Sequence, residues 1–207
     1  MPEVEPDSAQ TCRLLEQVGR GDQAALEQLL VRHRPDLQAF VGWHLDPRLR
    51  ARLDPSDVVH DAQLEVLRRM DDFLRRRPMP FRLWARRTAY ERLLNLRRDH
   101  RRRGRRSVDR EVPWPERSSL LLARPLVGGG PSPSQGLEAR ELAERVSRAV
   151  GGLAEADREV LMMRHAEELS YEEIGCLLGV EPAAARKRYG RALIRLQKAL
   201  TDHGVLE

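Results

Sequence analysis

The sequence predicts an all-α protein that consists of two small helical domains joined by a flexible linker. Apolar residues recur at spacings of three and four in both halves, whereas neither half has the alternating β-branched residues of strands. Between residues 107 and 136 the composition shifts to proline, glycine and serine, including GGGPSPS, which is typical of a linker. We therefore expect helical domains over 8–106 and 137–203, separated by this linker.

Four helices are expected in the first domain. Residues 14–21 suggest a short helix that ends at a glycine, and 22–45 a longer one, kinked or broken at Pro35. The DPSD motif at 54–57 supplies an aspartate N-cap and a first-turn proline, and PMPF at 78–81 marks another start. The third helix has an apolar stripe of Val59, Ala62, Val66, Met70 and Phe73. The fourth has one of Phe81, Ala85, Thr88, Arg92 and Leu96, widened by Trp84, Ala89 and Leu93.

The charge of the chain is concentrated in one segment. The 207 residues carry a formal charge of +5, with a pI near 9.8. Between Arg75 and Arg106, fourteen arginines face only Glu91 and Asp99, a local excess of +12, so the other residues sum to −7. This asymmetry indicates a polyanionic partner for that segment.

The two cysteines and the hydropathy pattern indicate a cytoplasmic protein. Cys12 and Cys176 lie far apart and lack metal-ligand spacing, which argues against a disulfide scaffold and fits a reducing compartment. No apolar run reaches 18 residues, and no signal-peptide core is present. We therefore expect no membrane insertion.

The second domain contains a helix-turn-helix pattern. Ser170 and Glu173 form the S-x-x-E capping box of a short helix. Gly175 lies within that helix, where a small residue permits close crossing and offsets a cost of ~1 kcal/mol relative to alanine. Gly179 supplies the turn, and Pro182 starts a longer helix.

The last helix has an apolar face and a basic face. Its apolar face comprises Ala185, Tyr189, Ala192 and Leu196. The residues that we expect to contact DNA are Ala184, Arg186, Lys187, Arg188 and Arg191. No acid occurs between Pro182 and Leu200. A recognition helix reads bases with its N-terminal residues and holds phosphates farther along, so DNA binding explains this helix better than an ordinary solvated basic face.

From about Leu14 to Leu200 the chain resembles RNA polymerase sigma factors of the extracytoplasmic-function (ECF) type. The signature LAEADREVLMMRHAEELSYEEIGCLLG, followed by AAARKRYGRAL, carries most of the likeness. The resemblance implies that residues 137–203 correspond to region 4, which binds the −35 element and the β flap. It implies that residues 8–106 correspond to region 2, which binds the β′ clamp and opens the −10 element. An anti-sigma factor is a further possible partner.

The segment DPSDVVHDAQLEVLRRM resembles the clamp-binding helix of these factors. Independently, four of its residues share one face away from the apolar stripe, and a leucine exposed among charges is what a small hot spot would contain. These expected polymerase-binding residues are Asp57, Asp61, Leu64 and Arg68. A solvated polar face with one stray leucine is the alternative. His60 stands where the family commonly has glutamine.

The segment PFRLWARRTAYERLLNLRRDHRRRGRR resembles the strand-opening helix. Trp84 matches the family's tryptophan, and stacking on an unstacked base is worth ~1–3 kcal/mol, although burial in the core explains Trp84 equally well. Glu91 stands where the family often has asparagine, with Asn95 nearby, so the −10 base that is read stays undetermined. The expected contacts to the −10 element and its phosphates are Trp84, Arg87, Asn95, Arg98, Arg102, Arg103 and Arg106.

The run RRDHRRRGRR is expected to hold phosphates, with Gly104 letting the chain leave the helix. If about five arginines of the basic segment touch phosphates, the log-log salt slope should be roughly −4.5. Trp114 and the apolar run 120–122 in the linker pack either within polymerase or on a neighbouring domain. No cofactor is implied.

Two other functional classes explain less. A transcriptional regulator with a sensing first domain would account for residues 153–200 but not for the +12 segment. A metal-dependent nuclease would need the cluster of Asp54, Asp57, His60 and Asp61. On a helix, residues 57 and 61 share a face that the other two largely miss, and the capping motif already explains the first two aspartates. We therefore expect no catalytic residue and no metal site.

Overall fold

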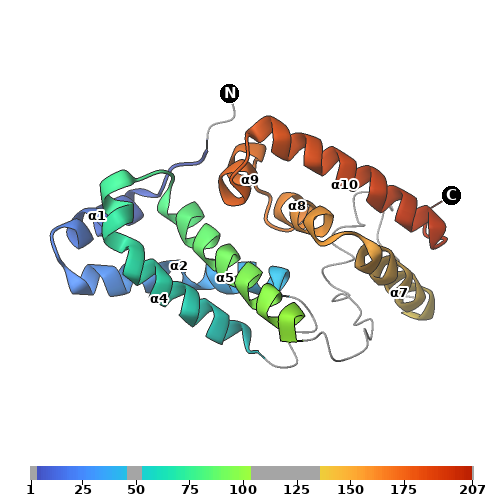
Figure 1. The fold of residues 1–207 in the computed structure, drawn as a ribbon, viewed down its shortest axis with the longest axis horizontal. Coiled ribbons are helices and arrows are strands. Elements are labelled where there is room, and N and C mark those ends of the chain that lie inside the picture. The colour runs from blue at the N-terminus through green and yellow to red at the C-terminus, as the bar shows by residue number, and fades with distance from the viewer. Residues whose placement is uncertain (1–3, 46–52, 104–135, 207) are drawn as a thin grey trace. The chain divides into compact units, whose positions relative to one another are not determined.

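The computed structural model describes residues 4–45, 53–103 and 136–206, and these ranges contain helices but no strand. The fold class predicted from the sequence is confirmed for them. They form two compact units. One contains α1, α2, α4 and α5, and the other contains α7, α8, α10 and most of α9 (Figure 1). No helix in the described ranges is long and apolar enough to cross a membrane.

The first unit begins with two helices whose starts are capped by side chains. Helix α1 (Ala9–Gly19) begins after Ser8, whose hydroxyl accepts a hydrogen bond from the amide of Thr11. Helix α2 (Gln23–His44) begins after Asp22, which accepts from the amide of Ala25. Such caps satisfy amides that have no partner within the helix. At its other end, α1 stops at Gly19, which confirms the predicted end of the first helix at Gly19 or Gly21.

Helix α2 continues through Pro35, so the structure does not break it there. A proline in a helix interior removes one backbone hydrogen bond and is costly. Here Leu29 and Leu37 on one side, together with Phe40 and Val41, are almost fully buried. Their burial, at about 1.5–3 kcal/mol for each large apolar side chain, offsets that cost.

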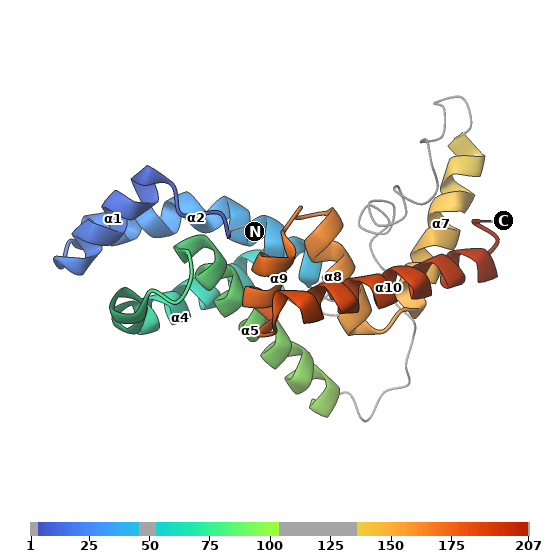
Figure 2. The same cartoon turned by 90° about the horizontal axis from the view of Figure 1, so that it is seen from above.

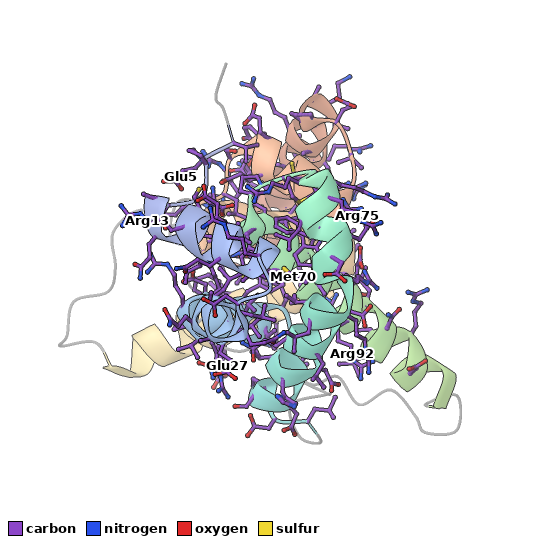
Figure 3. All side chains as sticks on the ribbon, turned by 90° about the vertical axis from the view of Figure 1, so that its left-hand side faces the viewer. Glu5, Arg13, Glu27, Met70, Arg75 and Arg92 are labelled. Carbon is purple, nitrogen blue, oxygen red and sulfur yellow. The ribbon has the colours of Figure 1, made fainter. Side chains whose placement is uncertain are left out.

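Helix α4 (Pro55–Arg76) begins as the sequence predicts. Asp54 is the N-cap and accepts a hydrogen bond from the amide of Ser56, and Pro55 opens the helix. Its buried residues are Val58, Val59, Ala62, Val66, Met70 and Phe73, which confirms the predicted stripe. Figure 3 shows Met70 pointing among the helices, whereas Arg13 and Glu27 lie at the periphery. Arg77 ends the helix in the left-handed region.

Helix α5 (Phe81–Arg103) is held at its start by the N-terminal segment. The Asp7 carboxylate accepts hydrogen bonds from the amides of Phe81 and Arg82, at 2.7 and 3.3 Å. Asp7 therefore caps a helix more than seventy positions farther along the chain. Nothing in the local sequence around PMPF predicts this distant cap.

The buried face of α5 differs in part from the predicted stripe. Its buried residues are Phe81, Leu83, Ala85, Thr88, Ala89, Tyr90, Leu93 and Arg97. Arg92 and Leu96 are only partly buried. The reason is that α5 packs against both α2 and α4, so its contact surface is wider than one helical stripe.

The second unit packs a long helix against shorter ones. Its elements are α7 (Gly136–Gly152), α8 (Glu155–His165), α9 (Tyr171–Leu178) and α10 (Pro182–Asp202). Helix α10 packs against both α7 and α8 (Figure 2). Its buried residues are Ala185, Ala192, Leu196 and Leu200. The predicted apolar face is confirmed at the two alanines and Leu196, whereas Tyr189 is only partly buried.

Candidate nucleic-acid interface

The turn between α9 and α10 has the geometry that the sequence predicts. The Glu173 carboxylate accepts from the amide of Ser170 at 2.9 Å, and the Ser170 hydroxyl accepts from the amide of Glu173 at 3.2 Å. This is a reciprocal capping box. Gly179 has a φ of +65°, a conformation that glycine adopts without steric cost. The turn therefore sets where α10 begins.

Gly175 is required by the close approach of this turn. A Cβ at this position would lie 2.7 Å from the carbonyl oxygen of Val180 and 3.4 Å from the nitrogen of Pro182. The Val180 amide donates to the Gly175 carbonyl at 3.0 Å. The sequence predicted a close crossing at Gly175; the neighbour is the backbone of the turn and the first residue of α10.

Helix α10 presents its candidate DNA-binding residues to solvent. Ala184, Arg186, Lys187 and Arg191 are exposed, and Arg188 is partly exposed. Within the part of the chain that the structure describes, no ion pair engages these four cations. The predicted basic face is therefore available to an external anion.

Aromatic residues of α8 and α9 pack beneath the first turns of α10. The Arg186 guanidinium lies over the Tyr171 ring, 5.7 Å from its centroid, and Arg164 lies 5.3 Å from the same centroid. The Tyr189 hydroxyl and His165 Nε2 are 3.0 Å apart. Burial, and then the charge of Arg164, lowers the pKa of His165. A neutral imidazole can accept a hydrogen bond from the Tyr189 hydroxyl, and this bond holds α10 against α8.

A partly buried ion pair fixes the middle of α10. Arg195 donates to the Asp157 carboxylate at 2.7 Å, and Asp157 is buried in the first turn of α8. An acid in a first turn also interacts favourably with the helix dipole. Ile194, next to this pair, is 68% exposed. The pair therefore orients the helix and engages Arg195 within the unit.

Helix α4 carries the candidate polymerase-binding face. Asp57 and Arg68 are exposed, and 38% of the Leu64 surface is accessible. Leu67, one helical turn away, is equally exposed. Asp61 differs from these residues because it forms an ion pair with Arg92 of α5 at 2.7 Å. The structure therefore adds Leu67 to the surface and ties Asp61 to the neighbouring helix.

Trp84 is partly buried and partly exposed. Its ring lies on that of Phe73, with centroids 4.5 Å apart and planes 30° apart, and 5.9 Å from that of Phe81. The two interpretations of this tryptophan thus both have a structural basis. One part of the ring contributes to the core, and the accessible part can contact a base.

Arg87 forms an ion pair with a carboxylate of its own helix. Its Nε lies 3.4 Å from Glu91 Oε1, and Glu91 Oε2 accepts from Arg69 Nη1 at 3.0 Å. Arg69 also pairs with Glu65 at 2.5 Å. Partial burial alone would lower the pKa of Arg69, but these two carboxylates more than offset it and raise that pKa.

The arginine run at the end of α5 is not one uniform surface. Arg97 is buried and donates to the carbonyl of His44 at the end of α2, which contradicts the expectation that the whole run holds phosphates. Arg98 is exposed and donates to the Asn95 carbonyl oxygen. Arg102 and Arg103 lie within the helix. Arg106, Gly104 and the linker residues Trp114 and 120–122 lie outside the described residues.

Sequence reasoning missed several residues of these surfaces. Leu67 could have been found from its spacing of three to Leu64. The pairing of Glu91 with Arg69 could not, because it joins two helices. Likewise, no local signal places Arg164 and Arg186 over one tyrosine ring.

Comparison with known families and proteins gives consistent matches. Residues 143–196 match the family described as Sigma-70, region 4. The RNA polymerase sigma factor CnrH of Cupriavidus metallidurans is 30% identical over 90% of this chain and 92% of its own length. The ECF RNA polymerase sigma-E factor of Escherichia coli K12 is 28% identical over 86% of this chain and 88% of its own.

Two solved structures share the fold. CnrH in complex with the cytosolic domain of CnrY aligns with a TM-score of 0.58 and 24% identity, over 94% of this chain and 99% of its own. RpoE of Bartonella quintana, in complex with the anti-sigma factor NepR, aligns with a TM-score of 0.57 and 20% identity, over 84% and 96%.

Proposed function

Since the chain belongs to the RNA polymerase sigma factors of the ECF type, a family of transcription initiation, we propose that it directs core RNA polymerase to promoters with −35 and −10 elements. In this proposal it is a dissociable subunit that acts in the cytoplasm. It has no catalytic role of its own, because nucleotide addition stays with core polymerase.

The observation that carries the −35 assignment is the exposed, acid-free start of α10. Arg186, Lys187 and Arg191 extend from a helix whose position is set by the glycine turn and the capping box. Arginine and lysine are suited to guanine edges in the major groove and to phosphates. We assign Arg186 and Lys187 to base contacts and Arg188 and Arg191 to the flanking phosphates.

The proposed −10 surface is on α5. The accessible part of Trp84 would stack on an unstacked base, which contributes ~1–3 kcal/mol. Arg98 and Asn95 lie exposed farther along the helix, where they would contact the backbone of the opened strand. Arg102, Arg103 and Arg106 extend the same basic segment in the sequence.

Core polymerase would bind mainly through α4. Leu64 and Leu67 are exposed between the charges of Asp57 and Arg68, and a small apolar centre with a polar rim is typical of an interface. We assign this surface to the β′ clamp and the second unit to the β flap. Because RpoE was solved with the anti-sigma factor NepR, we extend the expectation of an anti-sigma partner to this chain.

Run-off transcription tests the proposal directly. Core polymerase would be mixed with the purified protein and fragmented genomic DNA, and the transcript starts would be mapped. We expect transcription start sites that appear only when the protein is present. These sites should share a −35 element and a −10 element at a constant spacing upstream of the start. Co-purification with core polymerase would separate this function from that of a conventional regulator. Sequence-specific DNA binding by the isolated protein, without polymerase-dependent starts, would refute the proposal.

A further inference from the structure

Glu91 lies between two arginines that come from different helices. Its Oε2 accepts from Arg69 of α4 at 3.0 Å, and its Oε1 lies 3.4 Å from Arg87 Nε on α5. Arg69 also pairs with Glu65. The two guanidinium groups and two carboxylates thus neutralise one another on a surface that α4 and α5 share.

We propose that Glu91 is an intramolecular competitor that holds Arg87 and Arg69 until a DNA phosphate replaces its carboxylate. The inference rests on the proposed function, because it concerns how strongly the helix that carries Trp84 holds DNA. A carboxylate and a phosphate are bound by the same N–H groups of a guanidinium. They therefore compete whenever DNA approaches this surface.

The exposure of the network makes the exchange feasible. The side chains of Glu91, Arg87 and Arg69 are 42, 39 and 49% exposed, so water and salt screen their attraction. The Glu91–Arg87 distance of 3.4 Å is also long for a charged hydrogen bond. An external phosphate can displace such a contact.

The packing of the two helices does not depend on this network. Val66 of α4 and Leu93 of α5 are fully buried, and Asp61 pairs with Arg92 across the same two helices at 2.7 Å. These contacts remain when Glu91 changes partner. The carboxylate is therefore available for a role other than stability.

The consequence concerns selectivity. Within the basic segment, Arg87 is neutralised in the absence of DNA, so the protein binds arbitrary DNA more weakly than its arginine count suggests. A strand that is also held by other contacts can displace Glu91. Glu91 thus weakens binding to DNA that contacts the protein through phosphates alone.

The Glu91→Gln variant tests this inference in full-length protein bound to core polymerase, on a fork DNA with a single-stranded −10 segment. Glutamine keeps an oxygen that can accept from Arg69 but removes the charge. We expect tighter binding to the fork. On a duplex of arbitrary sequence, where the natural protein keeps Glu91 on Arg87, we expect a log-log salt slope that is steeper by about 0.7–0.9, the value for one more phosphate contact. On that duplex the gain in affinity should shrink about threefold between roughly 50 and 200 mM salt.

Two control variants separate competition from net charge. Glu27→Gln removes the same charge from an exposed position on α2, and we expect its salt slope to match that of the natural protein. Arg87→Gln, added to Glu91→Gln, should remove most of the gain. These two control results together would identify Arg87 as the group that Glu91 keeps from DNA.

Three results would overturn the inference: an unchanged salt slope of Glu91→Gln on the arbitrary duplex, an equal gain in Glu27→Gln, or a gain that survives the loss of Arg87. A changed −10 base preference in Glu91→Gln would also overturn it, because Glu91 would then read a base. If the natural protein does not bind the fork with core polymerase, the proposed function itself fails. If the natural protein binds the fork and Glu91→Gln changes neither the affinity nor the salt slope, only the competitor role of Glu91 fails.

Discussion

Helices α5 and α10 are both rich in arginine, but they offer those arginines differently. On α5, Arg87 pairs with Glu91, Arg92 pairs with Asp61, and Arg97 is buried against α2. On α10, the cations of the first turns are exposed on a helix without acids up to Leu200. The helix with the larger local charge is therefore the one whose described arginines are more engaged within the protein.

This difference shows that a count of charges measures the potential around a segment but not the number of groups available to a ligand. An arginine that bonds a carbonyl or a carboxylate of its own domain must break that contact before it can hold a phosphate. We expect α10 to bind DNA with its groups already in place, and α5 to exchange partners as it binds.

The largest expected effect concerns the close packing of Gly175 against the turn that leads into α10. Gly175→Ala should lower the free energy of unfolding of the second unit by about 3 kcal/mol, because the new methyl group would lie 2.7 Å from a backbone oxygen. Gly190→Ala is the matched control. Its Cβ would meet no atom within 4 Å, so it should stabilise α10 by about 1 kcal/mol. Urea unfolding followed by circular dichroism checks both, and equal effects would contradict the close approach at the turn.

A second prediction separates a buried arginine from an exposed one in the same run. Arg97→Ala should lower the free energy of unfolding of the first unit by about 2 kcal/mol, because the buried carbonyl of His44 loses its hydrogen-bond donor. Arg98→Ala should leave stability within about 0.5 kcal/mol and make the salt slope of DNA binding shallower by about 0.9. If Arg97→Ala instead made the salt slope shallower and Arg98→Ala lowered stability, Arg97 would be the residue that reaches DNA.

On α10 we expect a loss of base discrimination. Arg186→Ala should reduce the preference for the natural −35 sequence by about 1–2 kcal/mol, measured as relative transcription from matched and mutated promoters by polymerase with this protein. Lys198→Ala, near the far end of the same helix, serves as the control and should keep the preference. An Arg186→Ala variant with full preference would place base reading elsewhere.

The smallest effect is a pH dependence of the first unit. His33 is buried beside Thr11 and Phe81. Burial lowers its pKa below the usual 6.5, although the charges of Asp36 and Asp7 act in the opposite direction. The unfolded chain therefore takes up this proton at higher pH than the folded chain, so stability falls as the pH drops below about 6.5.

Tryptophan fluorescence during urea unfolding can follow this change in a protein that carries Trp114→Phe, because the other two tryptophans, Trp43 and Trp84, both belong to the first unit. The midpoint should be lower at about pH 5.5 than at about pH 7.5. His33→Gln should reduce this difference, whereas His60→Gln, at an exposed position on α4, should not. An unchanged difference in His33→Gln would assign the dependence to other groups.

The parts of the structure that could be predicted are those whose causes lie within a few residues. The caps at Asp54 and Ser170, the first-turn prolines of α4 and α10 and the turn at Gly179 all depend on short-range geometry. The stripe of α4 follows from helical periodicity because this helix buries one face. The wider buried surface of α5 could not be predicted in this way.

By itself, the sequence determined the helical class, the helix starts, the helix-turn-helix pattern, the basic face of α10 and the family resemblance, because local propensity and spacing encode them. Only the tertiary structure decided that Asp7 caps α5, that Arg97 is buried against α2 and that Glu91 of α5 holds Arg69 of α4. These contacts join residues 22 to 75 positions apart, and only the packing of helices brings such residues together.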